Sequence, residues 1–141
     1  MPSLLDTDHM TVLQRGGTDA AILIGRLRAI APDDYGTTII NYEEQTRGRL
    51  GQIHGAKDDK SEVYFYSQLN DTFRFYTNLA IWQYTAQAAL QYVSLRKQGI
   101  RIGTKDLKIA AIALVNGATV LTRNSKDFGK VPGLAIQDWT I

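Results

Sequence analysis

Leu107-Lys108-Ile109-Ala110-Ala111-Ile112-Ala113-Leu114 is followed, after Gly117, by Thr119-Val120-Leu121-Thr122. The first of these two segments is apolar on almost every side, which is typical of a buried helix. Gly117 stands where helices commonly end, and the second segment consists of residues that favour a strand. A buried helix that leads directly into a strand predicts an α/β fold.

The same alternation extends along the rest of the chain. Further strands are predicted at Ser3-Leu4-Leu5, Thr37-Thr38-Ile39-Ile40, Leu79 to Tyr84 and Leu134-Ala135-Ile136. Helices are predicted at residues 9–15, 20–30, 42–53, 62–77 and 86–97, with Asn41 as the cap of the third. No repeat or linker interrupts this order, so we predict a single domain spanning residues 1–141, with a parallel sheet covered by helices on both faces.

Composition narrows the chemistry that this chain can carry out. The 141 residues contain no cysteine and two histidines, which excludes a disulfide framework and argues against a cysteine or histidine metal site. Hydrophobic residues make up 44% of the chain, as in globular domains. The amino terminus does not resemble a signal peptide, and no apolar segment approaches the roughly 20 residues needed to span a bilayer. We therefore expect a cytoplasmic protein.

Four acidic residues stand where a strand or loop leads into a helix: Asp6, Glu44, Asp106 and Asp127. In a parallel sheet these positions meet at the carboxyl edge, where α/β folds place their sites. Carboxylates without neighbouring thiolates are ligands for a hard cation such as Mg²⁺ or Mn²⁺. Each acid also has a local explanation as a turn former or a helix-capping residue, so a protein-binding module without a metal remains an alternative.

Five segments in the same order resemble the motifs of PIN-domain toxins of the VapC family. They are Leu4 to Asp8, Tyr42 to Gly48, Ile102 to Ala111, Leu121 to Phe128 and Val131 to Trp139. The resemblance implies a PIN-like three-layer α/β/α sandwich. It also implies an Mg²⁺-dependent endoribonuclease that hydrolyses RNA with metal-activated water. Such a protein would be the toxin of a type II toxin–antitoxin pair, bound by a separate antitoxin protein and forming a homodimer.

The resemblance also assigns roles to individual positions. Asp6, Asp106 and Asp127 match the first, third and fourth acids of the family's metal site, and are thereby the expected catalytic residues. Glu44 rather than Glu43 matches the second acid, because the family pattern places a glycine four residues later and Gly48 stands there.

Further polar positions flank the fourth acid. Thr122 and Asn124 match residues that line the family site, and hydrogen bonds to a carboxylate or a ligand water are the expected role. Arg123 between them is a candidate phosphate contact. Residues 55–84 are rich in Tyr and Phe and match no motif, so substrate choice and antitoxin contact are both assigned to this segment as hypotheses.

One rival enzyme class shares the amino-terminal motif. Asp6-Thr7-Asp8 also resembles the nucleophile and acid pair of haloacid-dehalogenase-like phosphatases, which form an aspartyl phosphate. That family expects Thr or Val at the position of Met10 and a catalytic lysine on a later strand, and neither is evident. For Asp8, a role as a helix cap competes with a role as an additional ligand.

Overall fold

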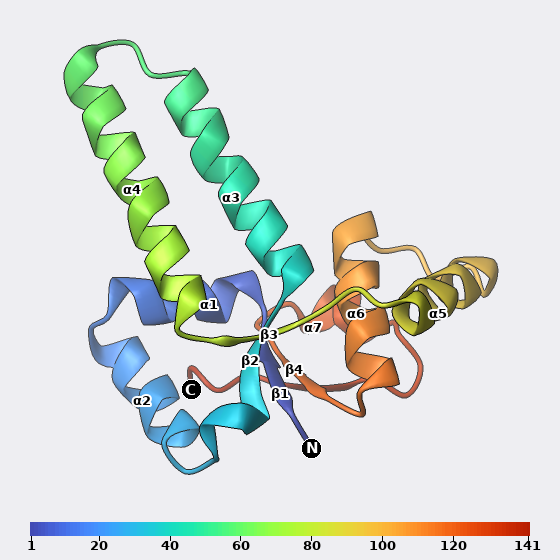
Figure 1. Cartoon of the computed structure of the whole chain (residues 1–141). Helices are drawn as coiled ribbons and strands as arrows, with labels where there is room; N and C mark the ends of the chain where they lie inside the picture. Colours follow the sequence, from blue (N-terminus) through green and yellow to red (C-terminus); the bar gives the residue numbers. More distant parts are fainter.

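A five-stranded parallel sheet forms the centre of the computed structural model, which describes residues 1–141 (Figure 1). The strand order is β3-β2-β1-β4-β5, and all four neighbouring pairs are parallel. The strands are β1 (Ser3–Leu5), β2 (Tyr35–Thr38), β3 (Ala80–Trp82), β4 (Thr119–Leu121) and β5 (Ala135–Gln137). Because every strand runs the same way, the carboxyl ends of all five lie at one edge of the sheet.

Seven α-helices and one 3₁₀ turn connect the strands and cover the sheet. They are α1 (Thr7–Arg15), α2 (Thr18–Leu27), the 3₁₀ turn η1 (Pro32–Asp34), α3 (Ile39–His54), α4 (Asp59–Thr77), α5 (Ala86–Lys97), α6 (Thr104–Val115) and α7 (Ser125–Phe128). The predicted helix at residues 86–97 has these same bounds, and the other predicted helices shift by a few residues at their ends. The predicted α/β fold class is confirmed.

Two hydrophobic cores, one on each face of the sheet, make the fold a three-layer sandwich. Leu4 and Val120 point into a core formed with α5, α6 and α7. Their neighbours Leu5 and Leu121 point the other way, into a core formed with α1 and α2. Successive residues of a strand face opposite sides, so each of these two strands is buried on both faces and carries two adjacent apolar residues.

The predicted strand at residues 37–40 is wrong in its second half. Ile39 and Ile40 open α3, although both are β-branched. Thr38 caps this helix by accepting a hydrogen bond from the backbone N–H of Asn41 at 3.2 Å, so Asn41 is not the cap that we predicted. The side chain of Asn41 is instead fully buried. A capping contact and tertiary packing outweigh the strand propensity of Ile here.

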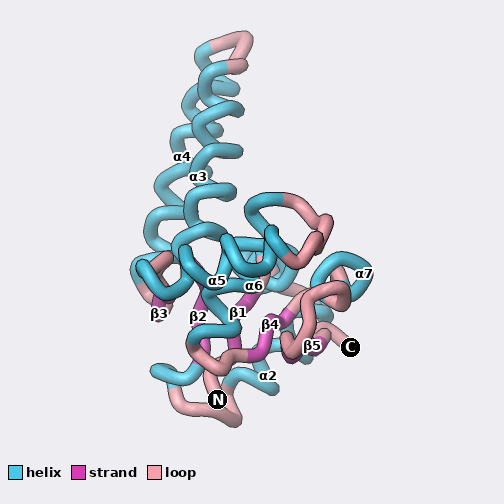
Figure 2. Tube along the Cα trace, turned by 90° about the vertical axis from the view of Figure 1, so that its right-hand side faces the viewer, coloured by secondary structure: helices cyan, strands magenta, loops and turns pink.

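A long helical hairpin projects from the sandwich. Figures 1 and 2 show α3 and α4 running side by side, with their connecting loop far from the sheet. Its base joins the core through Tyr76, which is 2% exposed. Further along α4, apolar side chains are exposed to solvent: Val63, Tyr64, Tyr66 and Phe73. No helix in the protein combines the length and apolarity that spanning a membrane would require.

Candidate active site at the carboxyl edge of the sheet

Asp6 is the most buried of the four predicted acids. It follows β1 directly and occupies the N-cap position of α1, with 8% of its surface exposed. Its backbone N–H donates to the carbonyl oxygen of Leu121 at 2.9 Å, which extends the pairing of β1 with β4 by one residue. The sheet therefore holds this carboxylate rigidly between its two central strands.

Two buried side chains hold the carboxylate of Asp6 in place. Asn41 Nδ2 donates to Oδ1 at 3.1 Å, and Thr122 Oγ1 donates to Oδ2 at 2.9 Å. Burial nevertheless raises the pKa of the Asp6 carboxyl, and the nearby carboxylate of Asp8 raises it further, whereas hydrogen bonds from Thr7, Thr122 and Asn41 act in the opposite direction. Asp6 is thus a fixed acid whose charge is only partly compensated by the protein.

Asp106 and Glu44 complete a cluster of like charges with Asp6. Asp106 lies in the first turn of α6. Burial, then the carboxylates of Asp6, Asp127 and Asp8, raise its pKa to about 6. Glu44 lies on α3, and burial followed by the carboxylates of Asp106 and Asp6 raises its pKa as well. These mutual effects on the pKa require that the carboxylates lie near one another.

Asp127 belongs to the same cluster and lies in a short helix that we did not predict from the sequence. It lies in the short helix α7, which Asn124 caps by accepting from the Asp127 backbone N–H at 3.3 Å. Asn124 Nδ2 also donates to the Asp127 carboxylate at 3.2 Å. Asn124 therefore orients the fourth acid, in keeping with its predicted supporting position. We refer to Asp6, Glu44, Asp106 and Asp127 as the carboxylate cluster.

Asp8 and His9 form a hydrogen-bonded pair that connects α1 to the backbone of Arg123 and Trp139, and the sequence did not indicate this pair. His9 is fully buried, with Nδ1 2.6 Å from Asp8 Oδ1, and its Nε2 accepts from the backbone N–H of Trp139 at 3.0 Å. The proton therefore resides on Nδ1 of a neutral ring. Asp8 also accepts from the backbone N–H of Arg123 at 2.9 Å. Asp8 is thus not the predicted helix cap, which is Asp6, and both of its carboxylate oxygens accept hydrogen bonds from the protein.

Basic side chains near the cluster are largely engaged in ion pairs. The guanidinium of Arg123 donates to Thr140 Oγ1 at 2.9 Å and lies 3.7 Å from Asp19. Its predicted phosphate contact therefore stays a prediction that would require these contacts to open. Glu43, the acid that we set aside, pairs with Lys105 and with Arg47, which hold the pKa of its carboxyl below the usual value.

The residue types present suit Mg²⁺ without forming a closed cage around it. No group of three or more His, Asp and Glu side chains is arranged so that it alone could hold a metal ion. Mg²⁺ commonly keeps several water ligands and binds through one or two carboxylates, so an open cluster of carboxylates fits it. Burial and the neighbouring carboxylates together raise the pKa of Asp106, and a divalent cation at this site would favour its ionised form.

Comparison with known proteins agrees with this geometry. None of the known protein-family models matches the chain. Over 138 residues, 97% of both chains, it is 29% identical to the ribonuclease VapC1 of Haemophilus influenzae (strain R2866). Its structure matches that of VapBC-1 from nontypeable Haemophilus influenzae over the full length of both chains, with a TM-score of 0.78 and 27% identity. In sequence and in fold, the chain is similar to VapC proteins over its full length.

A second VapC relative is more similar over a shorter region. The ribonuclease VapC2 of Rickettsia felis is 35% identical over 69 residues, which are 46% of this chain. That match spans about half the length of the relative, 52%. The motif resemblance to the VapC family, and with it the PIN-like sandwich, is therefore confirmed by comparisons that cover the whole fold.

Proposed function

We propose that this chain is the toxin of a toxin–antitoxin pair and acts as an endoribonuclease that hydrolyses RNA with the help of Mg²⁺. One observation carries the proposal: four separate segments bring Asp6, Glu44, Asp106 and Asp127 to the carboxyl edge, where their repulsion helps to raise the pKa of Asp106 to about 6. Repulsion among ionised carboxylates raises the free energy of the folded protein unless a cation is bound. The VapC relatives, which carry the name ribonuclease, support the same activity.

The cluster provides both rigid and adjustable ligands for Mg²⁺. When bound, Mg²⁺ lowers the pKa of a water molecule and neutralises charge that develops on the phosphate. Asp6 is held by Asn41 and Thr122, and Asp127 by Asn124, so these two carboxylates keep their positions. Asp106 and Glu44 accept no hydrogen bond from another side chain, which leaves them free to adjust to a cation.

Hollows on both sides of the cluster give RNA a path across it. One lies between α1, α3 and α4 and includes Thr7 and Gln45, the neighbours of Asp6 and Glu44; we call it the α1–α3–α4 pocket. The other, of about 630 Å³, lies beside α5 and α6 and includes Asp127 and Thr104 together with Arg96 and Arg101. A single-stranded RNA that occupied both hollows would pass directly over the carboxylates.

Partner proteins are part of the proposal. The structural neighbours include VapBC complexes, which supports an antitoxin as the partner of this chain. Exposed apolar side chains such as Val63 and Phe73 on α4, 71% and 55% exposed, favour a protein contact at the hairpin. We also propose that the chain forms a homodimer, with Leu90 and Val93 on α5 as exposed apolar residues that a second copy could cover.

The phosphatase alternative is disfavoured by the contacts of Asp8. In such an enzyme the second aspartate must exchange a proton with the leaving group. Here the Asp8 carboxylate accepts hydrogen bonds from His9 and from the backbone of Arg123, and its pKa is lowered: burial raises it, but the contacts with these two residues and with Thr122 outweigh that effect. A carboxylate with a lowered pKa is a poor general acid at neutral pH.

Cleavage of a structured RNA pool by purified protein tests this function. We expect cleavage with Mg²⁺, none with EDTA, and none by an Asp106→Asn variant purified in parallel as a control for contaminating nucleases. A wild-type protein that neither cleaves the pool nor binds Mg²⁺ by calorimetry would contradict the proposal. Trapping of a phosphate analogue covalently on Asp6 would instead support the phosphatase.

A further inference from the structure

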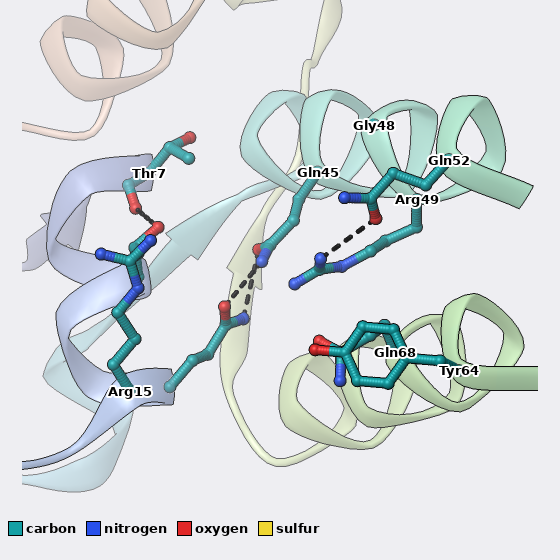
Figure 3. Close-up of a pocket in the computed structure, with 10 residues that line it drawn as sticks. Thr7, Arg15, Gln45, Gly48, Arg49, Gln52, Tyr64 and Gln68 are labelled. Atoms are coloured by element: carbon teal, nitrogen blue, oxygen red, sulfur yellow. Dashed lines mark hydrogen bonds between the residues drawn. The ribbon is translucent and has the colours of Figure 1, made fainter. Parts of the chain in front are cut away.

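The α1–α3–α4 pocket (Figure 3) includes Thr7 and Gln45, which follow the cluster acids Asp6 and Glu44 in the sequence, but it differs from the cluster in chemistry. It encloses about 570 Å³, and of its ten lining residues only Tyr64 is hydrophobic. Asn41 connects the two regions, since its Nδ2 donates both to Asp6 and to Thr7 Oγ1, each at 3.1 Å. This buried amide therefore fixes Thr7 of the pocket and Asp6 of the cluster relative to each other.

The pocket carries positive charge that the protein does not neutralise. No Asp or Glu lines it, whereas Arg15 and Arg49 do. Neither arginine lies within ion-pair distance of a carboxylate. Arg47, two residues before Arg49 on the same helix, pairs with Glu43 at 2.9 Å. Two unpaired guanidinium groups in a hollow without carboxylates form a binding site for an anion.

Arg49 is held in place for such a contact. Its Nε donates to Thr72 Oγ1 at 3.0 Å, and its Nη1 lies 3.3 Å from Gln52 Oε1. Thr72 on α4 is only 2% exposed, so this anchor belongs to the core of the hairpin. Nη2 has no partner in the protein. Figure 3 shows the side chain directed into the space between α3 and α4. A guanidinium fixed in this way loses little conformational entropy when it binds a phosphate.

Other residues of the pocket suit a nucleobase. Gln45 is locked, because it exchanges hydrogen bonds with Gln14 at 2.6 and 3.2 Å and accepts one from Tyr76 at 2.8 Å. On the opposite wall, α4 presents the amide of Gln68, which has no hydrogen-bond partner, and the ring of Tyr64, which is 59% exposed. Amides bind base edges, and aromatic rings stack on unpaired bases in single-stranded RNA.

We propose that the α1–α3–α4 pocket binds a nucleotide adjoining the scissile phosphate of the RNA substrate. Arg49 and Arg15 contact its phosphate, and Tyr64 and Gln68 contact its base. Arg49 lies five residues after Glu44 on α3, an axial rise of about 7.5 Å with the two side chains turned about 140° apart. The pocket reaches the cluster through Thr7, which follows Asp6 directly. The inference rests on the proposed ribonuclease function and deepens it. An acidic protein segment would engage the arginines but would leave the base contacts unused.

Binding without cleavage tests the pocket separately from the chemistry. The parent is the full-length Asp106→Asn protein in EDTA, and the probe is a fluorescein-labelled single-stranded RNA of mixed sequence and about 10 nucleotides. Anisotropy titrations between about 50 and 200 mM salt give the affinity and its salt dependence. We expect Arg49→Gln to weaken binding about tenfold and to reduce the slope of log K against log salt by about 0.7, the value for one phosphate contact.

Matched variants control for folding and for general surface charge. Arg15 makes no hydrogen bond, so Arg15→Gln should preserve the melting temperature and weaken binding about threefold. Tyr64→Leu should weaken binding about fivefold through lost stacking. Arg47→Gln removes the same charge from the opposite face of α3, and we expect it to change affinity less than about twofold.

Three results would overturn the inference. The first is unchanged RNA affinity in both Arg49→Gln and Arg15→Gln. That result would contradict the pocket alone, and the ribonuclease function would still be supported if wild type cleaves RNA with Mg²⁺. The second is an equal loss in Arg47→Gln, which would show general charge attraction. The third is an Asp-rich or Glu-rich peptide of matched charge that binds more tightly than the RNA and depends on Arg49, which would make the pocket a protein site. Loss of both cleavage and RNA binding in wild type would overturn the function and the inference together.

Discussion

The carboxylate cluster and the α1–α3–α4 pocket are neighbours with opposite character. The cluster gathers acids from four segments around the buried carboxylate of Asp6, and burial, together with repulsion from the other acids, raises the pKa of Asp106 to about 6. The pocket is lined by amides, hydroxyls and the unpaired arginines Arg15 and Arg49. We propose that the cluster binds a cation and the pocket an anion, so that hydrolysis of RNA and part of its binding are assigned to different regions. Each prediction below tests whether that division holds.

The largest expected effect is loss of cleavage when the fixed acid of the cluster is neutralised. Asp6→Asn should lower kcat at least about 100-fold, because Asp6 is the best-held of the proposed Mg²⁺ ligands. The double variant Asp6→Asn/Asp106→Asn should be no less active than either single variant, since residues that act as one unit are not additive. Single-turnover cleavage assays measure both. If the losses in kcat of the two single variants multiply in the double variant, Asp6 and Asp106 do not act in one shared site.

Removal of a support of Asp6 should have a smaller effect. Asn41→Ala deletes the 3.1 Å hydrogen bond to Asp6 and leaves a buried oxygen without its donor. We expect a loss of about 10- to 100-fold in activity or in Mg²⁺ affinity, as is usual for groups that orient metal ligands. Recovery of activity at higher Mg²⁺ concentration would identify a positioning role. An inactive variant that melts like wild type but does not respond to Mg²⁺ would argue against it.

A change in the pocket should alter substrate binding and spare the chemistry. Arg49→Gln should raise KM about five- to tenfold with kcat nearly unchanged, because Arg49 contacts a nucleotide that does not react. The Asp6→Asn variant should show the opposite pattern. Steady-state cleavage of one defined RNA substrate gives both parameters. A fall in kcat for Arg49→Gln as large as that for Asp6→Asn would erase the distinction between the two regions.

The smallest expected effect concerns stability without Mg²⁺. The pKa of Asp106 is about 6 when folded, above its ordinary value of 3.8, so the folded state holds this proton more tightly than the unfolded state. Ionisation therefore destabilises the fold, and the cost grows as pH rises from about 4 to about 6 and then stays constant. Asp106→Asn in EDTA should be more stable than wild type by on the order of 1 kcal/mol at pH 8, after allowance for solvent screening.

Urea unfolding at two pH values checks this prediction. Near pH 4 the difference between Asp106→Asn and wild type should disappear, because the wild-type carboxyl is then largely protonated when folded. Addition of Mg²⁺ at pH 8 should stabilise wild type and not the variant, since binding to the folded state alone raises its stability. An equal difference at both pH values would show that repulsion within the cluster is not its cause.

Local sequence patterns were sufficient to predict most of the fold. The apolar segment around Ala110 and the strand at Val120 are buried on both sides, so their composition alone indicated α6 and β4. Asp6, Asp106 and Asp127 could be named because they stand at a strand end or in the first turn of a helix. Glu44 lies one turn further into α3, and the resemblance to the VapC motifs selected it over Glu43. The half-wrong strand at Ile39 and Ile40 shows the limit, since a cap from Thr38 overrides residue propensity there.

Buried polar contacts between distant segments could not be predicted from such local patterns. Asn41 has the sequence features of a helix cap, yet it binds Asp6 from 35 residues away. His9 gave no signal of burial, yet it joins Asp8 to the backbone of Trp139 near the carboxyl terminus. Such contacts depend on which helix face packs against which strand end, and no local spacing records that arrangement.

Local hydrophobic pattern and the positions of strand ends were enough to establish the α/β class and most of the strands and helices along the chain. How equivalent residues divide their roles depends on packing between distant segments, which no local pattern records. Arg47 and Arg49 are the same residue type two positions apart on one helix. Helical geometry turns them to opposite faces, so Arg47 meets Glu43 while Arg49 meets Thr72 of the neighbouring helix and faces the pocket.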